Sequence, residues 1–319
     1  MEAQKICIVQ LGRIGDLILM TPMFKALKQA NPNNEIHLLA GKHNANFAKL
    51  IQNVDSVHIY QKNFFSTIKL LKDLYLQKFD IWIDPKDHKS TESELFATII
   101  PATKKIGFNR NGNGPFDVPI KADVEQQDVH ALQRNLDVLS HFKLKNLPQR
   151  PILALNAESE IEFEKFLNAN NISNYVLVNI SASSDTRLWQ KEHWQKLLDQ
   201  LGNRKICSLV ISDPKDWQHA IELTSHDDLA FFYKTSSLND VFSVINCAEL
   251  LVTPDTAVVH MAAVFDTPIV ALYNNAVKNT IKFAPLSRIA ISIMPPDKDA
   301  PVAEIEFDKV WHAVESIVR

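Results

Sequence analysis

Three short segments of this sequence carry side chains whose types and spacing could do chemistry. The first, Gly12-Arg13-Ile14-Gly15-Asp16, directly follows an apolar run from Ile6 to Leu11. Asp16 at a helix start is expected to act as a cap, since free amides and the helix dipole stabilise a carboxylate there. A carboxylate that faces a ligand could instead remove a proton from an acceptor hydroxyl. We expect the two glycines to allow positive φ or a close approach of a ligand, although the G-x-G-x-x-G spacing of dinucleotide-binding turns is absent.

The second segment, "NISASSDTRLWQKEHW" from Asn179 to Trp194, is rich in hydrogen-bond donors. Hydroxyl groups and the guanidinium of Arg187 lie within a few residues of one another, which is what binding of a diphosphate requires. The alternative is a solvated loop in which Arg187 pairs with a neighbouring acid such as Asp185. We expect Trp189 and Trp194 to be packing residues.

The third segment, "LLVTPDTAVVHMAAVFDTPIVALY" from Leu250 to Tyr273, predicts a strand, a helix and a strand. Asp255 and Thr256 stand where a helix cap is expected, and the free amides after Thr256 could bind an anion. His260 has two interpretations, a contact of that anion site or a buried core histidine.

The elements that position these segments alternate between strand-like and helix-like patterns, which is typical of a parallel sheet. We expect strands at 6–11, 35–40, 57–60, 80–84 and 105–108, and again at 175–180, 206–211, 229–233, 250–252, 269–273 and 289–293. We expect helices at 17–29, 65–76, 92–99 and 131–142, and again at 193–201, 217–223, 238–245, 258–265 and 307–318.

The two sets of elements predict two α/β domains joined near residue 150, because residues 143–151 hold two prolines and few apolar side chains. A chain of 319 residues also exceeds what one hydrophobic core usually serves. Two such halves imply a cleft in which the carboxyl ends of both sheets face one ligand.

Composition excludes several classes of protein. The chain is 46% hydrophobic and 22% charged with a formal net charge of -3, so no positive field is available to gather nucleic acid. The apolar run near the N-terminus is shorter than a secretory signal or a membrane span, which favours a cytoplasmic protein. Cys7, Cys207 and Cys247 lie among apolar residues and are expected to be reduced core thiols.

Taken together, the segments resemble glycosyltransferase family 9, the bacterial heptosyltransferases that build the lipopolysaccharide core. The resemblance rests on "IVQLGRIGDLILMTPMFKALKQANPNNEIHLLAG", "VNISASSDTRLWQKEHWQKLLDQL" and "LVTPDTAVVHMAAVFDTPIVALY", with "KKIGF" at 104–108 and "HALQRNLDVL" at 130–139 in the same order. It covers most of the chain and is specific as a set.

The resemblance implies an α/β GT-B fold of two Rossmann-like parallel-sheet domains. Residues 1–150 would bind the acceptor, residues 151–305 the nucleotide sugar, and a last helix, 306–319, would pack back on the first domain. The family transfers L-glycero-D-manno-heptose from ADP-heptose with inversion and, in its best-known members, without a metal at the site. No cofactor is therefore expected.

The same resemblance implies roles for individual residues. Asp16 stands at the position of the family's proposed general base, within an acceptor-side loop that includes Gly12, Arg13 and Gly15. Ser183 and Arg187 match a hydroxyl and a lysine that contact the diphosphate. The remaining donor-side positions are Asp216 for the ribose, Asp255 and Thr256 for sugar and phosphate, Ala257 beside them, and the motif histidine His260.

The sequence departs from the family pattern at four places. Ser181 lies where the family has glycine in Asn-Pro-Gly-Ala-Ser, Ala257 replaces the glycine of Asp-Ser/Thr-Gly, and Arg187 replaces lysine. These changes leave the nucleobase and the sugar of the donor open. "DPKDHKSTES", residues 84–93, differs from the family's glycine-containing turn and leaves the acceptor open.

We therefore predict an inverting glycosyltransferase that moves a sugar, expected to be heptose, from a nucleotide diphosphate to a lipopolysaccharide core or related glycan. A lipid-linked acceptor would bring the protein into peripheral contact with the cytoplasmic face of the inner membrane. Two alternatives remain open: a sugar-nucleotide epimerase on the same architecture, and a non-catalytic nucleotide-sugar-binding protein.

Overall fold

The protein, seen here in a computed structural model, consists of two compact units, Met1–Leu153 and Ala154–Arg319. The structure describes residues 2–109, 112–142, 144, 146–274 and 277–318. Lys143 and Lys145 of the expected linker lie outside this description. The boundary between the units is close to the expected one near residue 150, and each unit is described by itself.

The first unit is built on a six-stranded parallel sheet with the strand order β3-β2-β1-β4-β5-β6. Its strands are β1 (Lys5–Gln10), β2 (Glu35–Gly41), β3 (Ser56–Tyr60), β4 (Phe79–Ile83), β5 (Ala102–Gly107) and β6 (Val118–Pro119). The chain starts at the centre, adds β2 and β3 on one side, and then crosses to add β4 on the other. The point where this order reverses lies between β1 and β4, and ligands bind at the carboxyl ends of strands at such a point.

The second unit repeats this plan with the order β12-β11-β10-β7-β8-β9, again all parallel. Its strands are β7 (Val176–Asn179), β8 (Ser208–Ile211), β9 (Ala230–Phe232), β10 (Leu250–Pro254), β11 (Ile269–Leu272) and β12 (Ala290–Ile293). Here the order reverses between β7 and β10. The expected fold class, α/β with two parallel sheets, is confirmed.

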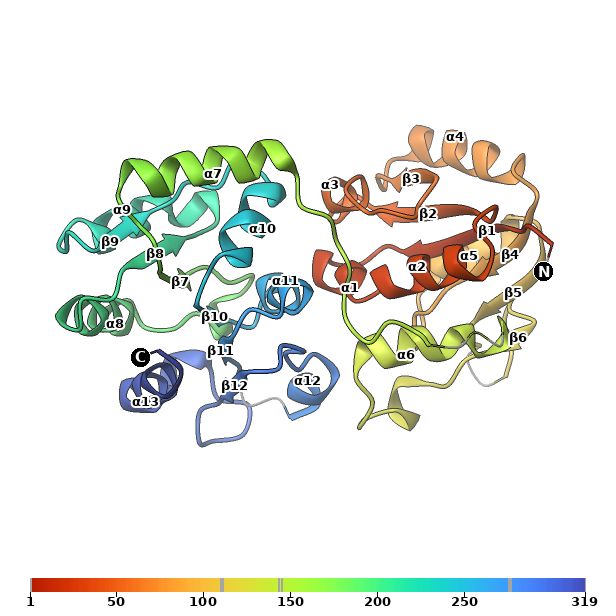
Figure 1. Ribbon diagram of the computed structural model, residues 1–319. Coiled ribbons are helices and arrows are strands. Elements are labelled where there is room, and N and C mark those ends of the chain that lie inside the picture. Colours follow the sequence, from red (N-terminus) through yellow and green to blue (C-terminus); the bar gives the residue numbers. More distant parts are fainter. Residues whose placement is uncertain (1, 110–111, 143, 145, 275–276, 319) are drawn as a thin grey trace. The chain divides into compact units, whose positions relative to one another are not determined.

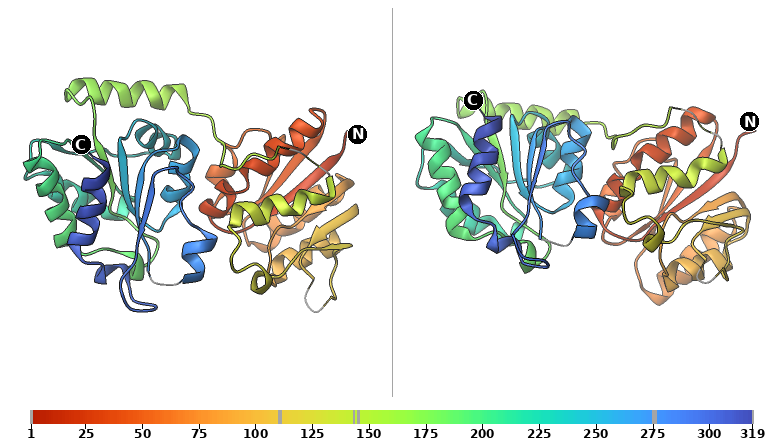
Figure 2. Two further views of the ribbon diagram at one scale, coloured as in Figure 1. Left: turned by 60° about the horizontal axis from the view of Figure 1, so that its bottom comes forward. Right: turned by 90° about the horizontal axis from the view of Figure 1, so that it is seen from below.

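Helices cover both faces of each sheet (Figure 1, Figure 2). In the first unit α2 (Thr21–Ala30) lies beside α6 (Ala131–Asp137), and α4 (Phe64–Tyr75) beside α5 (Thr91–Ile99). In the second, one layer holds α7 (Ala157–Ala169), α10 (Leu238–Asn246) and α11 (Ala257–Phe265), and the other holds α8 (Lys191–Asn203), α9 (Trp217–Thr224) and α13 (Phe307–Ile317). The remaining elements are α1 (Ile14–Ile18), α3 (Ala45–Ala48), α12 (Val277–Lys282) and the 3-10 turns η1 (Asp123–Glu125), η2 (Val138–Phe142), η3 (Asp185–Arg187), η4 (Pro214–Asp216) and η5 (Val302–Glu304).

This two-sided cover explains the composition of the central strands. Strands β7, β10 and β11 are buried at every residue, and β1 at its four central ones. A strand buried on both faces has no solvent side, so its residues are mostly apolar rather than alternating, and the polar exceptions, Asn179 and Thr253, lie toward the carboxyl ends of β7 and β10. Trp189 and Trp194 lie in the hydrophobic core of the second unit, as expected for packing residues.

Several predicted elements were wrong in detail. The single helix expected over residues 17–29 is two helices, α1 and α2, because Pro22 has no amide to continue the first helix and instead occupies the first turn of the second. The helix α7 was missed because Phe163 is its one buried residue, which leaves no apolar periodicity to detect. Cys247 is exposed at the end of α10 rather than a core thiol.

The last helix, α13, belongs to the second unit. Phe307, Val310 and Val314 form part of the hydrophobic core of that unit, and the helix contacts α8 and the strands β10 to β12. The second unit therefore includes the helix that the sequence analysis set apart and expected on the first domain. Among the described residues no helix is both long enough and apolar enough to cross a bilayer.

Gly41 at the end of β2 shows how tightly the reversal point of the first sheet is packed. A Cβ atom on residue 41 would lie 2.5 Å from the carbonyl oxygen of Leu11, at the start of the loop that leads to Asp16. Backbone cannot move aside as a side chain can, so only glycine fits here.

We expect Gly41→Ala to lower the free energy of unfolding by about 1–3 kcal/mol, the usual cost of overpacking. Gly202→Ala is the matched control, because the added atom would meet only the carboxylate end of the Asp227 side chain, which can move aside. Calorimetric Tm values of both variants provide the measurement. A Gly41→Ala protein as stable as the wild type would contradict this account of the loop.

Candidate functional site

The reversal of strand order in the second sheet brings two of the predicted loops together. The loop after β7 contains Ser183 and Arg187, and the loop after β10 contains Asp255 and Thr256. Both follow neighbouring parallel strands, so both start at the same edge of the sheet.

Asn179, the last residue of β7, ties these two loops to each other. Its buried Nδ2 atom donates to Thr253 Oγ1 in β10 at 2.8 Å and to the Ser181 carbonyl at 3.3 Å. Its Oδ1 atom accepts from the amide of Ser181 at 3.3 Å. A buried amide with these partners fixes the path of the chain beyond the strand. Sequence analysis assigned Asn179 no role, because its partner Thr253 is distant in sequence.

Ser181, one of the departures from the family pattern, holds Asp216 in place. Its hydroxyl donates to Asp216 Oδ2 at 2.5 Å and accepts from the amide of Asp213 at 2.8 Å. Lys215 Nζ donates to the carbonyl of Ala182 at 3.0 Å, which adds a second tie between η4 and the loop after β7. Burial raises the pKa of Asp213 above its ordinary value, and Lys215 opposes this shift. A serine in place of glycine thus supplies a contact that glycine could not make.

Arg187 and Asp255 form an ion pair across the two loops. Arg187 Nη1 lies 3.2 Å from Asp255 Oδ2 and donates to the Asp255 carbonyl at 3.0 Å. The guanidinium is part-buried and the carboxylate is buried. Arg187 was expected to contact a diphosphate or to pair with a neighbouring acid such as Asp185. The acid that it pairs with is Asp255, a second predicted donor residue, and the contact with a diphosphate stays a prediction. A guanidinium fixed on one side still offers its other N–H groups to a ligand.

The remaining donor-side residues lie along the start of α11. Thr256 is the N-cap, and its side chain accepts from the amide of Val258 at 3.3 Å, as predicted for a cap. Ala257 is the first helical residue and half-buried. His260 is buried in the helix, with its ring centroid 6.0 Å from that of Phe283. Ser183 is exposed in the loop after β7.

In the first unit the reversal point lies between β1 and β4, and the predicted loop of Gly12 to Asp16 follows β1. Neither Gly12 nor Gly15 has positive φ, so neither residue uses that freedom here. A Cβ atom at position 12 would lie 2.8 Å from Gln10 Oε1 and 3.1 Å from Asp16 Oδ2, both at the ends of side chains. Gln10 Oε1 accepts from the Gly12 amide at 2.8 Å and so occupies this space.

Asp16 is the third residue of α1 and half-exposed. Its Oδ2 atom accepts from the amide of Arg13, the N-cap residue, at 3.2 Å, so Asp16 holds the helix start from the third position and is not itself the N-cap. Arg13 itself is exposed. Whether the same carboxylate also takes a proton from a substrate stays a prediction.

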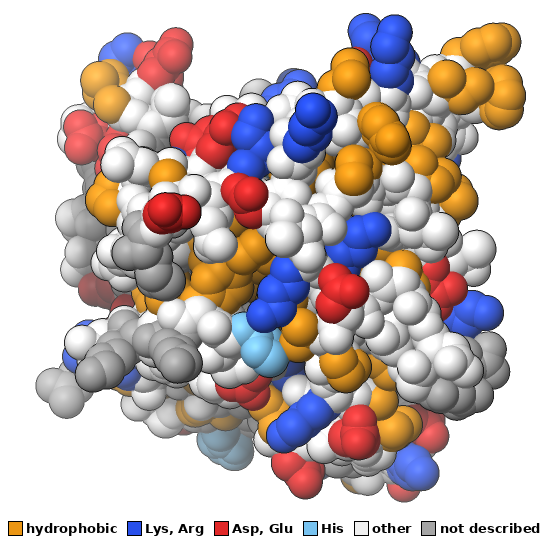
Figure 3. Space-filling view, turned by 90° about the vertical axis from the view of Figure 1, so that its right-hand side faces the viewer, with side chains coloured by type: hydrophobic (Ala, Val, Ile, Leu, Met, Phe, Trp, Pro, Cys, Tyr) orange, Lys and Arg blue, Asp and Glu red, His pale blue; other side chains and the backbone are white. Residues whose placement is uncertain are grey.

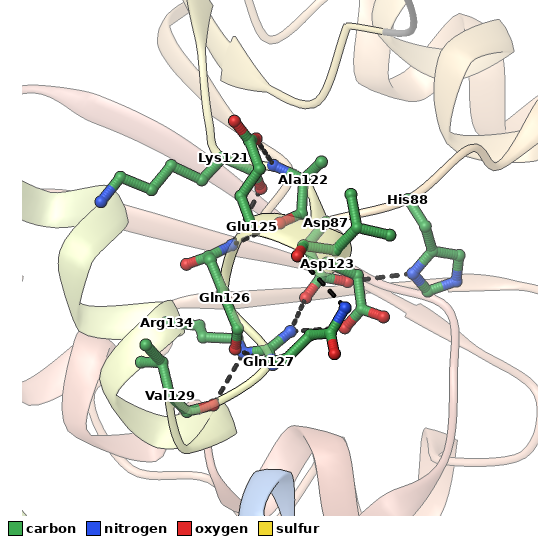
Figure 4. A network of polar contacts seen from close by, with 11 residues as sticks. Asp87, His88, Lys121, Ala122, Asp123, Glu125, Gln126, Gln127, Val129 and Arg134 are labelled. Carbon is green, nitrogen blue, oxygen red and sulfur yellow. Dashed lines mark hydrogen bonds and ion pairs between the residues drawn. The ribbon is translucent and has the colours of Figure 1, made fainter. Parts of the chain in front are cut away.

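The loop after β4, across the reversal point from Asp16, is held by a polar network that sequence analysis missed (Figure 4). The buried Arg134 of α6 places its Nη1 atom 2.6 Å from Asp87 Oδ2 and 2.5 Å from Asp123 Oδ1. Its Nε atom donates to the carbonyl of Val129 at 2.8 Å, and its Nη2 atom donates to the carbonyl of Gln126. Both "DPKDHKSTES" and "HALQRNLDVL" are conspicuous in the sequence. Asp87 and Arg134 are 47 positions apart in the sequence, however, and nothing in either segment indicates that the two side chains are in contact.

Asp84, the first residue after β4, is a buried carboxyl group at this edge. It accepts from the amide of Lys86 at 3.1 Å, and its own amide donates to Ile106 in β5. Burial raises the pKa of Asp84 to about 6, although the hydrogen bonds from Lys86 and Ser93 work in the opposite direction. Among the described residues no group of three His, Cys, Asp or Glu side chains is placed to hold a metal ion.

Comparison with known proteins decides the family. The model described as "Glycosyltransferase family 9 (heptosyltransferase)" matches residues 67–305. The chain belongs to glycosyltransferase family 9. Lipopolysaccharide heptosyltransferase 3 of Escherichia coli K12 is 22% identical to this family 9 chain over 278 residues, covering 81% of this chain and 79% of that one.

Solved structures agree on the fold of this family 9 protein. A family 9 glycosyltransferase from Veillonella parvula matches with a TM-score of 0.84 and 18% identity over 99% of this chain and 98% of that one. The E. coli heptosyltransferase WaaC, solved with ADP, matches with a TM-score of 0.78 and 16% identity over 98% and 100%. The fold is therefore GT-B, as expected, and the protein is a glycosyltransferase of the heptosyltransferase family.

A UDP-GlcNAc 2-epimerase from Methanocaldococcus jannaschii shares the fold with a TM-score of 0.57 and 14% identity. That likeness concerns the fold alone. Family membership decides against the epimerase alternative. The family match begins at residue 67, so the loop that carries Asp16 lies outside it.

The raised pKa of Asp84 predicts a pH-dependent stability of the first unit. The carboxyl group ionises near its ordinary value of 3.8 when unfolded and near 6 when folded. Between these values the folded state holds a proton that the unfolded state has released, so stability falls as pH rises from about 4 to above 6.

Asp84→Asn keeps an oxygen for the Lys86 amide but cannot ionise. We expect this variant to be more stable than the wild type by about 2–3 kcal/mol near pH 8, with the difference shrinking toward pH 4. Asp128→Asn, at an exposed aspartate, is the control. Urea denaturation across this pH range is the measurement, and a difference independent of pH would contradict the assignment.

Proposed function

We propose that this family 9 enzyme transfers a sugar, expected to be heptose, from an ADP-linked donor to a lipopolysaccharide core or related glycan acceptor, with inversion at the anomeric carbon. The observation that carries the proposal is the Arg187–Asp255 pair beside the N-terminus of α11, at the reversal point of the second sheet. The relatives support the substrate class. E. coli lipopolysaccharide heptosyltransferase 3 is similar over most of the chain, and WaaC has been solved with ADP and with ADP-2-deoxy-2-fluoro heptose.

The second unit is assigned to the donor. Arg187 and the free amides at the start of α11 can stabilise a diphosphate, because both present N–H groups to an anion. Asp216 is assigned to the ribose hydroxyls, with Ser181 holding its carboxylate in position. Ser183, Thr256 and His260 are assigned to contacts with the diphosphate and sugar.

The first unit is assigned to the acceptor, with Asp16 as the general base. In the proposed step an acceptor hydroxyl oxygen bonds to the anomeric carbon while the bond from that carbon to the diphosphate breaks. The hydroxyl proton passes to the Asp16 carboxylate, and ADP leaves with the electron pair of the broken bond. Negative charge grows on the departing diphosphate, where Arg187 stabilises it.

The direct test is to incubate the full chain with ADP-heptose and a lipopolysaccharide core acceptor and to measure ADP release and product mass. Product larger than the acceptor by one heptose is expected. ADP-heptose binding without any transfer to a panel of glycan acceptors would favour the non-catalytic alternative. Transfer from a UDP-sugar instead would overturn the assigned donor.

For Asp16 we expect Asp16→Asn to lower turnover by about 10²-fold or more while the affinity for ADP changes little. Asparagine keeps an oxygen that can accept from the Arg13 amide, so the cap is retained and only the base is lost. Steady-state kinetics and calorimetry with ADP are the measurements. Turnover within a few-fold of the wild type would leave Asp16 a helix cap and nothing more.

For Arg187 we expect Arg187→Ala to lower turnover by about 10²-fold, more than it weakens ADP binding, because the guanidinium acts most strongly on charge that develops in the transition state. Arg187→Lys should recover part of the loss. The double variant Arg187→Ala/Asp255→Asn removes both charges of the ion pair and tests whether Arg187 serves only to neutralise the carboxylate of Asp255. If it restored turnover, Arg187 would serve only to neutralise Asp255.

A further inference from the structure

The outward face of α4 in the first unit carries an unusual number of large apolar side chains. Leu70 and Leu74 face inward and are buried, as expected of a surface helix. The solvent side is also apolar, with exposed fractions of 72% for Phe64, 80% for Phe65, 51% for Ile68, 55% for Tyr75 and 63% for Leu76. At about 100° per residue these five positions share one side of the helix. An exposed apolar face of this kind marks a surface that something else covers.

Lysines are interleaved with these apolar residues. Lys69 and Lys72 are exposed on the same side of α4. Lys62, just before the helix, is paired with Glu92 at 2.6 Å and is not counted among them. The one acid within α4 is Asp73. Figure 3 shows orange and blue side chains together in the upper part of this face of the first unit, where Figure 1 places α4.

The start of this helix is firmly held, so its exposed aromatic rings are presented in a defined place. Asn63 caps α4, with its Oδ1 accepting from the Ser66 amide at 3.3 Å and its carbonyl accepting from Thr67 Oγ1 at 2.7 Å. The rings of Phe64 and Phe65 pack edge to face with centroids 5.5 Å apart.

This helix start also lies at the functional edge of the first sheet. Helix α4 follows β3 after three residues, and β3 runs parallel to β1 and β4. Phe64 and Phe65 therefore project from the same edge of the sheet as the loop of Asp16 and the loop of Asp84. The acceptor assigned to that edge would meet this helix on its way in or out.

We propose that the outward face of α4 docks on an anionic lipid bilayer. The mixture of side chains distinguishes a bilayer from a protein partner, because lysines are depleted in the cores of protein interfaces. At a membrane surface the aromatic and aliphatic side chains enter the boundary between headgroups and acyl chains, and lysines between them extend to lipid phosphates. That the surface is a membrane bearing the acceptor rests on the proposed function.

Sedimentation of the full chain with lipid vesicles tests the docking surface without donor or acceptor present. We expect binding to vesicles of phosphatidylcholine and phosphatidylglycerol mixed at about 2:1, and weaker binding to phosphatidylcholine alone or at high salt. Phe64→Ser/Phe65→Ser should weaken binding about tenfold or more. Lys69→Gln/Lys72→Gln should weaken it about fivefold per lysine.

Ile161→Ser/Ile221→Ser removes two exposed apolar side chains from helices of the second unit and is the matched control, expected to bind like the wild type. Equal Tm values across the variants verify that each is folded. Failure of the wild type to bind the mixed vesicles, or full binding by Phe64→Ser/Phe65→Ser, would overturn the proposal. Self-association that the same variant abolishes, with no vesicle binding, would assign the face to a second copy of the chain.

The two proposals fail separately. Phe64→Ser/Phe65→Ser should transfer sugar to a delipidated, water-soluble acceptor within a few-fold of the wild type, because neither side chain is among those assigned to the chemistry. A large loss with that acceptor, together with unchanged vesicle binding, would assign the helix to acceptor recognition and overturn lipid docking. Absence of transfer by the wild type would contradict the proposed function alone, since vesicle binding is read without substrates.

Discussion

The structure of both units depends on one constraint, that a parallel strand buried on both faces can expose polar groups only at its ends. In each sheet the first strand, β1 or β7, lies at the centre, with later strands added on one side and then on the other. The residues within these strands are committed to packing. Polar chemistry is therefore confined to the loops at the carboxyl ends, and it concentrates where the strand order reverses.

Polar contacts between residues distant in sequence fix the loops that follow these strands. Asn179 joins β7 to β10, Arg187 joins the loops that follow them, and Arg134 joins the loop after β4 to α6. A buried polar group is costly unless it is paired, so each contact also excludes other arrangements of its loop. Rigid loops of this kind suit a reaction in which the diphosphate must be met by charges already in place.

The departures from the family pattern acquire a physical meaning in this context. Ser181 makes two hydrogen bonds that a glycine could not make, both toward η4. Arg187 contacts the Asp255 carbonyl and carboxylate, both through Nη1, and so joins the two loops by a charged side chain. At position 181 the chain therefore has a hydrogen-bonded side chain where the family has glycine. At position 187 it has a guanidinium paired with Asp255 where the family has lysine.

Sequence by itself indicated the family and the order of most elements, because apolar periodicity and turn residues are local signals. It placed the strand before Asp16, the cap at Thr256 and the start of α8 within a few residues. It failed where a local signal was weak: the helix break before Pro22 lies inside an apolar stretch, and the polar helix α7 has a single buried residue. Only the tertiary structure decided that Arg187 contacts Asp255 and that Arg134 contacts Asp87. The partners are 68 and 47 positions apart in the sequence, and the topology of the sheets brings them together, so no local pattern could predict either contact.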